Sequence, residues 1–507
     1  MGKIENEPAL PACLGNNSLV FAPTAGMRLA PEVLVFELFR ELGYGDSRNA
    51  DEMKAREFSD VVDTPSLSEA ERLLLSACRG RQKKTRAQRS EFFYAPPYLG
   101  LSRHAWLRKR TDRTLRDYFL GGALAHQEAL GNFDKDLVVQ ALLGHRSARD
   151  VEDSPSKEIL SLLALGERAD PPANNVLENL RMAVGDARRA PLALGRCEDP
   201  LAFLLSEDFL ELCRLESTIA RREWLFFLIA FLRIATTMWM LAHLRFTIMV
   251  RDWVLSAAKG EETPTVEERL AAIRRRHEGL LHPSSSPTRE VFEHVEVYMR
   301  ARVELRLLVG EIETMNRERF TTASGEAKSL SLDQHGARFV TLGDLLDLAR
   351  NCDWSTDKDG KTLRQWLTRE AEKYPAWRSP RTRGQGKNID EFIRVLYRSA
   401  DDESGSGLLI RCPATTTRIV PGHRLLQLFA FLAAEAKSRS QGKERGKLVL
   451  RDIEQHLYDY GIDFRSSSFG RPLLIEKLME GGFLVGSPDA GESAEVLDTV
   501  GMARSSA

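Results

Sequence analysis

The sequence predicts a mainly α-helical protein of several domains, and three observations lead to this fold class. Apolar residues recur at helical spacing along most of the 507-residue chain, and one segment is apolar on every side of a helix. Only two short stretches have the pattern of a β-hairpin. Hydrophobic residues make up 43% and charged residues 29% of the chain, which is typical of a folded globular protein.

The apolar segment, Trp224–Leu244, contains one charged side chain, Arg233. Helical character continues to about Ala258, so we expect a long central helix that the rest of the protein encloses. In that position Arg233 needs an acidic partner, because an unpaired buried charge is costly. The alternative is a membrane span at 224–244, since about 20 apolar residues can cross a bilayer. Arg233 opposes insertion by about 2.5–3.5 kcal/mol.

The net charge of −1 excludes a whole-protein attraction to nucleic acid or anionic lipid, so any such attraction has to be local. Six cysteines are scattered without a CxxC pair, which argues against a zinc ribbon and a disulfide framework and fits a reducing cytosol. The first residues, MGKIENEPALPACL, contain no apolar signal region. We therefore expect a cytoplasmic protein.

The segment Arg79–Arg116 is the most charge-biased part of the chain. It contains twelve Lys/Arg against two acids, a local net charge of +10, and five interleaved aromatic residues. Positive charge follows phosphates and aromatic rings stack on unpaired bases, so this composition favours a surface that contacts nucleic acid. The alternatives are rings packed into the core beside solvated or ion-paired arginines, and a surface for a partner protein.

The helices expected outside the C-terminal region follow from periodicity and capping residues. Their ranges are 30–45, 66–80, 134–145, 154–166, 176–190, 199–217, 224–258, 262–282 (capped at Thr263 or Thr265), 289–320, 339–352, 361–374 and 389–400. Residues 374–387 are rich in proline, glycine and basic residues, which predicts a mobile basic loop. Residues 407–412 and 416–420 form one expected hairpin.

The last region has a recognisable order of elements. A helix over 422–439, a basic loop, a short strand over 447–450, helices over 450–462 and 466–482, and a hairpin over 483–497 follow one another. This order resembles a winged helix-turn-helix over residues 421–498. Its last helix carries Arg471 and Lys477 but also Glu476 and Glu480, and a helix of balanced charge is a poor reader of the major groove. We therefore expect protein docking or phosphate contact there rather than base readout.

These patterns divide the chain into five regions. They are an N-terminal lead-in with a short helix (1–65), a basic helical domain (66–198), a central helical bundle with the long apolar helix (199–320), a small helical domain with the basic loop (338–420) and the winged-helix-like domain (421–498).

The basic residues expected to contact nucleic acid all belong to clusters of Lys and Arg in the sequence. They are Arg79, Arg81, Lys83, Lys84, Arg86, Arg89, Arg103, Arg108, Lys109, Arg110, Arg113, Arg378, Arg381, Arg383, Lys443, Arg445, Lys447, Arg471 and Lys477.

Motifs for catalysis and metal binding are only approximated. The stretch 355–362 ends in Gly-Lys-Thr but lacks the first glycine of a phosphate-binding loop, and as a calcium loop it has Trp366 where a glutamate is needed. In HEGLLH, His277 and His282 are five residues apart instead of four, which does not fit the zinc motif on a helix. We expect no catalytic residue, metal or cofactor.

The sequence thus favours a non-enzymatic helical subunit or scaffold that contacts the phosphate backbone of nucleic acid and joins other protein subunits. Arg-, Ala- and Leu-rich usage suggests a bacterial source, and analogy suggests a complex for DNA maintenance or anti-phage defence. The alternatives are a membrane-associated scaffold and an enzyme, such as a nuclease, whose site is assembled from dispersed residues.

Overall fold

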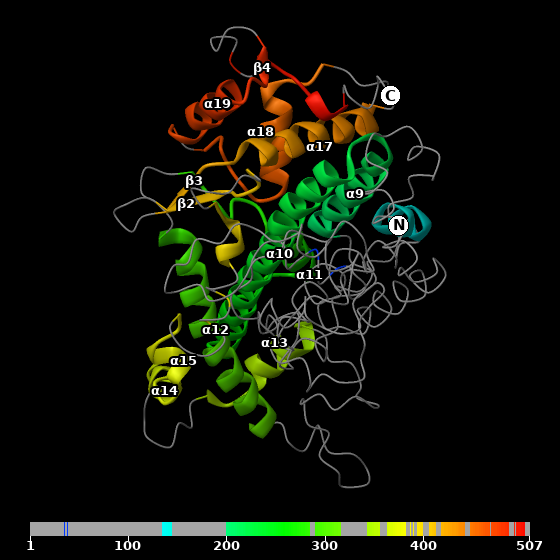
Figure 1. Cartoon of the computed structure of the whole chain (residues 1–507). Helices are drawn as coiled ribbons and strands as arrows, with labels where there is room; N and C mark the ends of the chain where they lie inside the picture. The colour runs from blue at the N-terminus through cyan, green and yellow to red at the C-terminus, as the bar shows by residue number, and fades with distance from the viewer. Residues whose placement is uncertain are drawn as a thin grey trace, which may run out of the picture.

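The computed structural model describes residues 35, 38, 134–143, 199–283, 289–315, 342–354, 362–381, 386, 389, 393–398, 405–411, 417–441, 447–466, 468–485, 491 and 493–501. This part of the chain is 73% helix and 4% strand, which confirms the mainly α-helical class. Figure 1 shows long helices in the lower part and the C-terminal helices and strands at the top.

The longest described helix is α10 (Arg221–Ala258), and it contains the apolar segment. Its portion Glu223–Ala258 has a mean hydropathy of 1.9 over the most apolar 18 residues, long and apolar enough to cross a membrane, and all of those 18 residues are buried inside the protein. Residues Trp224–Leu244 therefore lie in the interior, as expected for a helix with apolar side chains all round. The Trp224 indole Nε1 donates to the Leu212 carbonyl at 2.7 Å.

Arg233 is buried near the middle of this helix, with 2% of its surface exposed. Its Nε donates to the Val395 carbonyl at 2.5 Å, and its Nη1 donates to the Ser406 hydroxyl. Two of the hydrogen bonds of Arg233 thus go to neutral acceptors. The contacts also connect α10 to residues more than 160 positions away in the chain.

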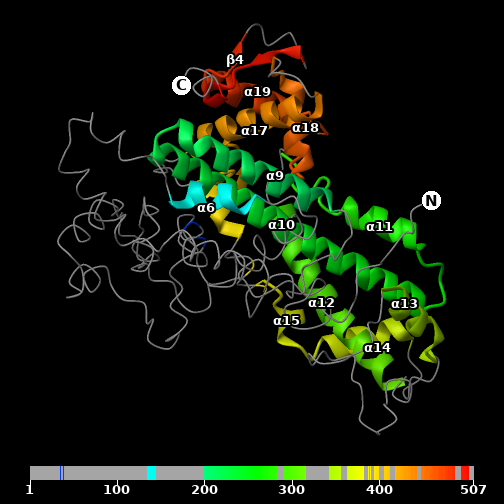
Figure 2. The same cartoon turned by 90° about the vertical axis from the view of Figure 1, so that its right-hand side faces the viewer.

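Helix α10 contributes side chains to two hydrophobic cores. Its first half packs with α9 (Pro200–Leu215) and α17 (His423–Gln441). Its second half, from Phe246, packs with α12 (Arg289–Met315) and α13 (Leu342–Asn351). Figure 2 shows α10 running along the molecule, with α9 and α17 toward one end and α12 and α13 toward the other. The smaller helices α14 (Leu363–Ala371) and α15 (Pro375–Arg378) lie against α12, and α6 (Lys135–Leu143) lies against α9.

The helix starts follow the capping residues in the sequence. Thr265 and Glu268 form a capping box at α11 (Val266–Arg274), and Thr362 and Gln365 do the same at α14. The predicted end of the α11 helix at residue 282 was wrong, because α11 ends at Arg274 and is followed by turns up to Leu281. Asp199 caps α9, accepting from the Leu201 and Ala202 amides at 3.1 and 3.4 Å; the short helix η6 (Glu216–Thr218) follows α9.

A small sheet forms beside Arg233. Strand β2 (Leu409–Arg411) pairs antiparallel with β3 (Thr417–Ile419), which confirms the first hairpin, and parallel with β1 (Tyr397–Arg398). The helix predicted over 389–400 was therefore wrong at its end, where η9 (Arg394–Leu396) leads into β1. The Leu396 carbonyl accepts from the Leu408 amide at 2.9 Å, and the Val395 carbonyl accepts from Arg233, so neither continues a helix.

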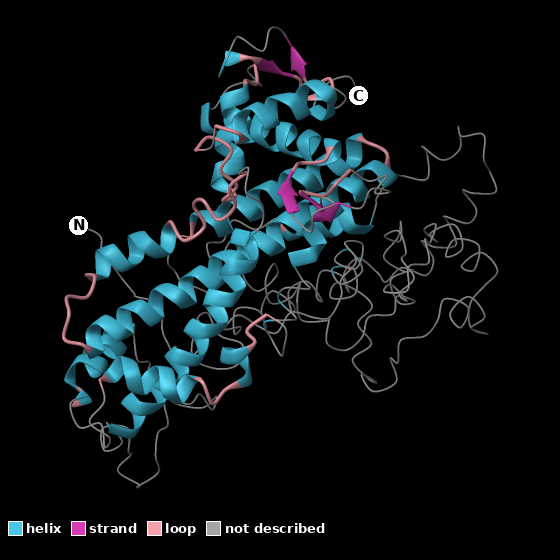
Figure 3. Cartoon of the chain, turned by 90° about the vertical axis from the view of Figure 1, so that its left-hand side faces the viewer, coloured by secondary structure: helices cyan, strands magenta, loops and turns pink. Residues whose placement is uncertain are grey.

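The C-terminal elements follow α17 in the expected order (Figure 3 shows the whole chain by secondary structure). They are an isolated bridge between Val449 and Glu495, α18 (Leu450–Asp459), α19 (Gly470–Glu480) and the antiparallel strands β4 (Leu484–Val485) and β5 (Glu495–Val496). Leu281, in the segment after α11, forms a parallel bridge to Ile462, in the segment after α18.

Candidate nucleic-acid interface

The residues predicted to contact nucleic acid fall into two groups. The larger group lies outside the described residues: Arg79, Arg81, Lys83, Lys84, Arg86, Arg89, Arg103, Arg108, Lys109, Arg110, Arg113, Arg383, Lys443 and Arg445. The described group consists of Arg378, Arg381, Lys447, Arg471 and Lys477. The structure places these five on two separate parts of the molecule.

The three in the C-terminal part are each paired with a carboxylate. Arg471 Nε lies 2.9 Å from the Glu454 carboxylate, and Lys447 Nζ lies 3.0 Å from that of Glu495. Lys477 Nζ lies 2.6 Å from the Glu480 carboxylate and 3.2 Å from that of Glu476, both on its own helix. Local carboxylates thus balance these charges, and this part of the predicted set adds little to a positive surface.

Arg378 and Arg381 lie at the opposite part of the molecule, in and just after the single helical turn α15. Tyr374 precedes this turn with an extended backbone and Pro375 occupies its first position, where the fixed backbone angle of proline favours helix initiation. Arg378 is exposed, and its Nε donates to the Glu372 carbonyl at 2.7 Å. Tyr374 is 47% exposed.

Helix α12 adds two arginines to this region. The Arg300 guanidinium lies over the Trp377 ring, 5.6 Å from its centroid, and also pairs with Glu296 at 3.0 Å. Partial burial and the neighbouring Arg302 charge lower the pKa of Arg306, while the nearby Tyr374 and Tyr298 act in the opposite direction. Two arginines of α12 thus lie beside the two aromatic residues of the α15 turn.

We call the group Arg300, Arg306, Tyr374, Trp377 and Arg378 the α12–α15 surface. Its cations come from two elements that are separate in the sequence, and both of its aromatic side chains come from the α15 turn and the residue before it. The ammonium of Lys373 pairs with Glu370 and the guanidinium of Arg300 pairs with Glu296, so the positive charge of this surface is partly balanced. The arrangement can hold an anionic group against the arginines and offer a ring face next to it.

A glycine holds the basic segment against α12. A Cβ on Gly386 would lie 1.6 Å from the Pro380 carbonyl oxygen and 2.9 Å from the Met299 Cγ, so any side chain at this position would collide with the backbone. The prediction of a mobile loop over 374–387 was therefore wrong for its described part, which contains a helical turn and a buried glycine contact.

The sequence reasoning missed Arg300 and Arg306, because both lie on a helix that was interpreted only as part of a bundle. A signal was present, since positions 300, 302 and 306 of that helix are all arginine. Alone, however, such a run equally fits a solvated or ion-paired helix face. The position of Arg300 over the Trp377 ring distinguishes it, and that contact depends on the fold.

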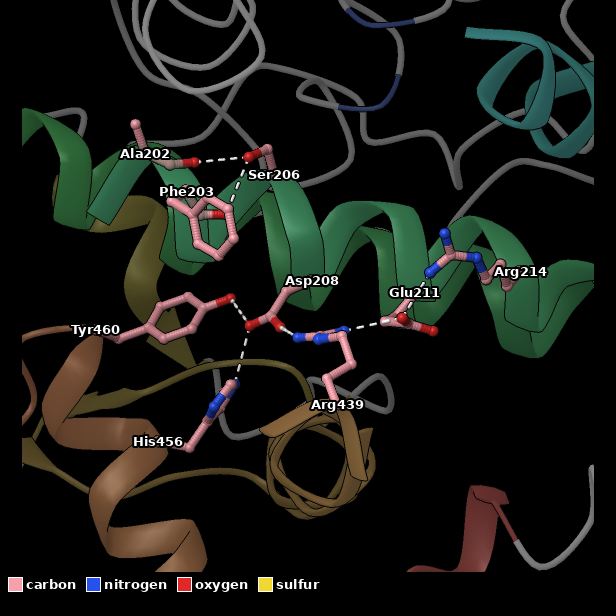
Figure 4. A network of polar contacts seen from close by, with 9 residues as sticks. All are labelled: Ala202, Phe203, Ser206, Asp208, Glu211, Arg214, Arg439, His456 and Tyr460. Carbon is pink, nitrogen blue, oxygen red and sulfur yellow. Dashed lines mark hydrogen bonds and ion pairs between the residues drawn. The ribbon is translucent and has the colours of Figure 1, made fainter. Parts of the chain in front are cut away.

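A second polar cluster lies between α9 and the C-terminal helices (Figure 4). Asp208 of α9 is fully buried; its carboxylate accepts from the Tyr460 hydroxyl at 2.7 Å and lies 2.9 Å from His456 Nε2. Arg439 of α17 pairs with Asp208 at 3.4 Å and with Glu211 at 2.8 Å. Burial and the Asp208 charge raise the pKa of Tyr460 well above its usual value.

The Asp208 cluster joins elements and is closed to solvent, because Asp208, His456 and Tyr460 are all at most 3% exposed. A substrate of any size has no access to these groups without movement of α17 or α18. We therefore assign the cluster a structural role, in which it fixes the C-terminal helices on α9.

Among the described residues, no group of three or more His, Cys, Asp or Glu side chains is placed to hold a metal ion. His277 is buried in the turn after α11, and burial lowers its pKa to about 4. His282 Nδ1 lies 3.2 Å from the Ser466 hydroxyl, so the two histidines of HEGLLH have separate surroundings. No protein-family model, curated protein or solved structure matches this chain.

Proposed function

We propose that the protein is a non-enzymatic helical scaffold subunit that contacts the phosphate backbone of nucleic acid within a larger bacterial assembly. DNA maintenance or anti-phage defence in the cytoplasm is the setting we favour, by analogy alone. The observation that carries the proposal is the α12–α15 surface. There the exposed Tyr374 and Arg378 lie in one turn, and Arg300, which also pairs with Glu296, lies over the half-buried Trp377.

Charge is the physical basis of the proposal. The chain has a net charge of −1, so attraction to a polyanion requires basic residues to be gathered locally. Phosphate binding by Lys and Arg releases condensed counterions from the nucleic acid, which supplies affinity independent of base sequence. The α12–α15 surface provides one such place, and the +10 segment Arg79–Arg116 provides a second in the sequence.

The C-terminal part supports the role of a subunit that joins other proteins. The order of its elements, and the bridge from Val449 to Glu495 beside β4, support its interpretation as a winged helix. The outward positions of α19 and the hairpin are not basic. Phe469 is 37%, Met479 50% and Val485 42% exposed, a composition that favours docking of a protein over contact with DNA.

The test is binding of fluorescently labelled oligonucleotides to the full chain over a range of salt concentrations. The double variant Arg300→Gln/Arg378→Gln should weaken binding and flatten the slope of log affinity against log salt, by about 0.9 for each duplex phosphate that is no longer neutralised. The variant with Arg108, Lys109 and Arg110 changed to Glu should do the same. Lys447→Gln removes one positive charge of an ion pair in the C-terminal part, away from the α12–α15 surface, and serves as the control.

Two results would contradict the proposal. One is that wild-type protein binds no oligonucleotide at low salt. The other is that the control Lys447→Gln lowers affinity as much as the double variant, because binding would then follow total charge and not the α12–α15 surface.

A further inference from the structure

Tyr374 is placed where its ring face can meet a ligand. It stands immediately before α15 with an extended backbone, and the Arg378 amide donates to the Tyr374 carbonyl at 3.4 Å, which keeps the two residues close. Nearly half of Tyr374 is exposed, at 47%, and Arg378 is exposed beside it. A large aromatic ring next to an exposed cation is the pairing that single-strand binding proteins use.

The arginines of α12 extend this pairing along the surface. Arg306 lies near Tyr374, and Arg300 lies over Trp377, so each aromatic residue of the α15 turn has an arginine of α12 as its neighbour. Six residues separate the two arginines, which corresponds to about 9 Å along a helix axis. Arginines of α12 thus lie near both aromatic residues of the α15 turn.

We propose that the α12–α15 surface binds single-stranded nucleic acid, with one base stacked on Tyr374 and the adjoining phosphates held by Arg378, Arg300 and Arg306. This inference rests on the proposed function and specifies the form of its ligand. In a duplex the base faces are covered by neighbouring bases, so a protein ring can stack only on an unpaired base. The arginines, by contrast, attract the phosphates of either form.

The experiment compares Tyr374→Ala with Tyr374→Phe in the full chain. Phenylalanine keeps the ring face and alanine removes it, and the exposure of this side chain makes both substitutions tolerable to the fold, which thermal unfolding checks. Probes are single-stranded DNA, single-stranded RNA and duplex DNA of equal length. Phe469→Ala removes another partly exposed ring, on α19, and is the control.

We expect Tyr374→Ala to weaken single-strand binding at least about fivefold, as removal of one base–aromatic stack does elsewhere. Tyr374→Phe and Phe469→Ala should leave it unchanged, and duplex binding should not respond to any of the three. Photo-crosslinking of a strand that contains 5-bromouracil should attach to Tyr374 or Trp377. The DNA and RNA arms show whether the surface distinguishes the two sugars.

Failure of this inference and failure of the proposed function have different signatures. If single strands and duplex bind equally, both respond to Arg300→Gln/Arg378→Gln and neither responds to Tyr374→Ala, the phosphate function stands and the single-strand inference is overturned. If no probe binds at low salt, both are overturned.

Discussion

The Tyr460 hydroxyl at the end of α18 donates a 2.7 Å hydrogen bond to the Asp208 carboxylate in the middle of α9. The two residues are 252 positions apart in the chain, and neither is exposed by more than 1%. Asp208 also meets His456 and Arg439, so one buried carboxylate connects three helices. Because a buried charge needs its partners, the stability of the C-terminal part should depend on this contact.

Tyr460→Phe should lower the free energy of unfolding by about 1.5–3 kcal/mol, because the variant removes a buried hydrogen bond to a charged acceptor and keeps the ring. Urea unfolding measures the change. Tyr458→Phe is the control, since its hydroxyl makes a longer 3.4 Å contact to Glu278 in a half-buried position. If the two variants lowered the free energy of unfolding equally, the hydrogen bond from Tyr460 to Asp208 would have no special part in stability.

Arg233 gives a second prediction, which separates a buried α10 from a membrane span. Arg233→Leu removes the guanidinium that donates to the Val395 carbonyl and the Ser406 hydroxyl, and a buried polar group left unsatisfied costs about 1–3 kcal/mol. Stability in detergent-free buffer should fall accordingly. If α10 crossed a membrane, Arg233→Leu would instead stabilise the inserted helix, because removing a central arginine lowers the cost of insertion by about 2.5–3.5 kcal/mol.

Thr237→Val, on the same helix, is the control for Arg233→Leu. The Thr237 hydroxyl is buried without a hydrogen-bond partner in the described part of the protein, so its removal should cost little. Protein that needs detergent to stay in solution, or Arg233→Leu that is more stable than wild type, would contradict the enclosed helix.

The sequence predicted the mainly helical class and the long central helix, because both depend on local periodicity and on an all-round apolar composition. The caps at Thr265 and Thr362 are equally local, since the partner residue lies three positions away. It missed the end of α11 and strand β1. At β1 the decisive interactions come from Arg233 and Leu408, residues that no local helical pattern contains.

The candidate interface was predictable only in part for the same reason. Arg378 and Arg381 stood out because they lie in a short run of basic residues. Arg300 joins them only through contact between α12 and the α15 turn. The ion pairs of Arg471 and Lys447 join residues 17 or more positions apart, so a count of charges along the sequence does not show that these two are balanced.

Three histidines predict how stability depends on pH. Burial lowers the pKa of His243 to about 3 and the pKa values of His277 and His294 to about 4. Nearby arginines, Arg276 for the first two and Arg245 for the third, act in the same direction. An unfolded histidine titrates near 6.5, so below about that pH the unfolded chain binds protons that the folded chain does not.

Above about pH 6.5 the three histidines should therefore not lower the free energy of unfolding. It should fall as the pH is lowered toward 4, by at most about 1.4 kcal/mol per pH unit for each histidine. Urea unfolding of wild type and His277→Gln at several pH values isolates one histidine from the carboxylates that titrate in the same range. The variant should show a shallower slope, and parallel curves would contradict a neutral buried His277.

Arg471 provides the last prediction, which tests whether its charge belongs to the fold or to a ligand. Its partner Glu454 is 2% exposed while Arg471 itself is 31% exposed. Arg471→Gln removes a charged partner of the buried Glu454 carboxylate and should lower the free energy of unfolding by about 1–3 kcal/mol. Lys447→Gln breaks a pair whose lysine is 79% exposed, and surface pairs of this kind contribute about 0–1 kcal/mol.

Oligonucleotide binding should be unaffected by Arg471→Gln if the charge is balanced as the structure indicates. The two readouts together distinguish the roles. A variant that keeps its stability but has weaker affinity and a flatter salt dependence would make Arg471 a phosphate contact, and the surface of α19 would then belong to the nucleic-acid interface instead of to a protein partner. A variant with reduced stability alone places Arg471 with the Asp208 cluster, among the interactions that hold the C-terminal helices together.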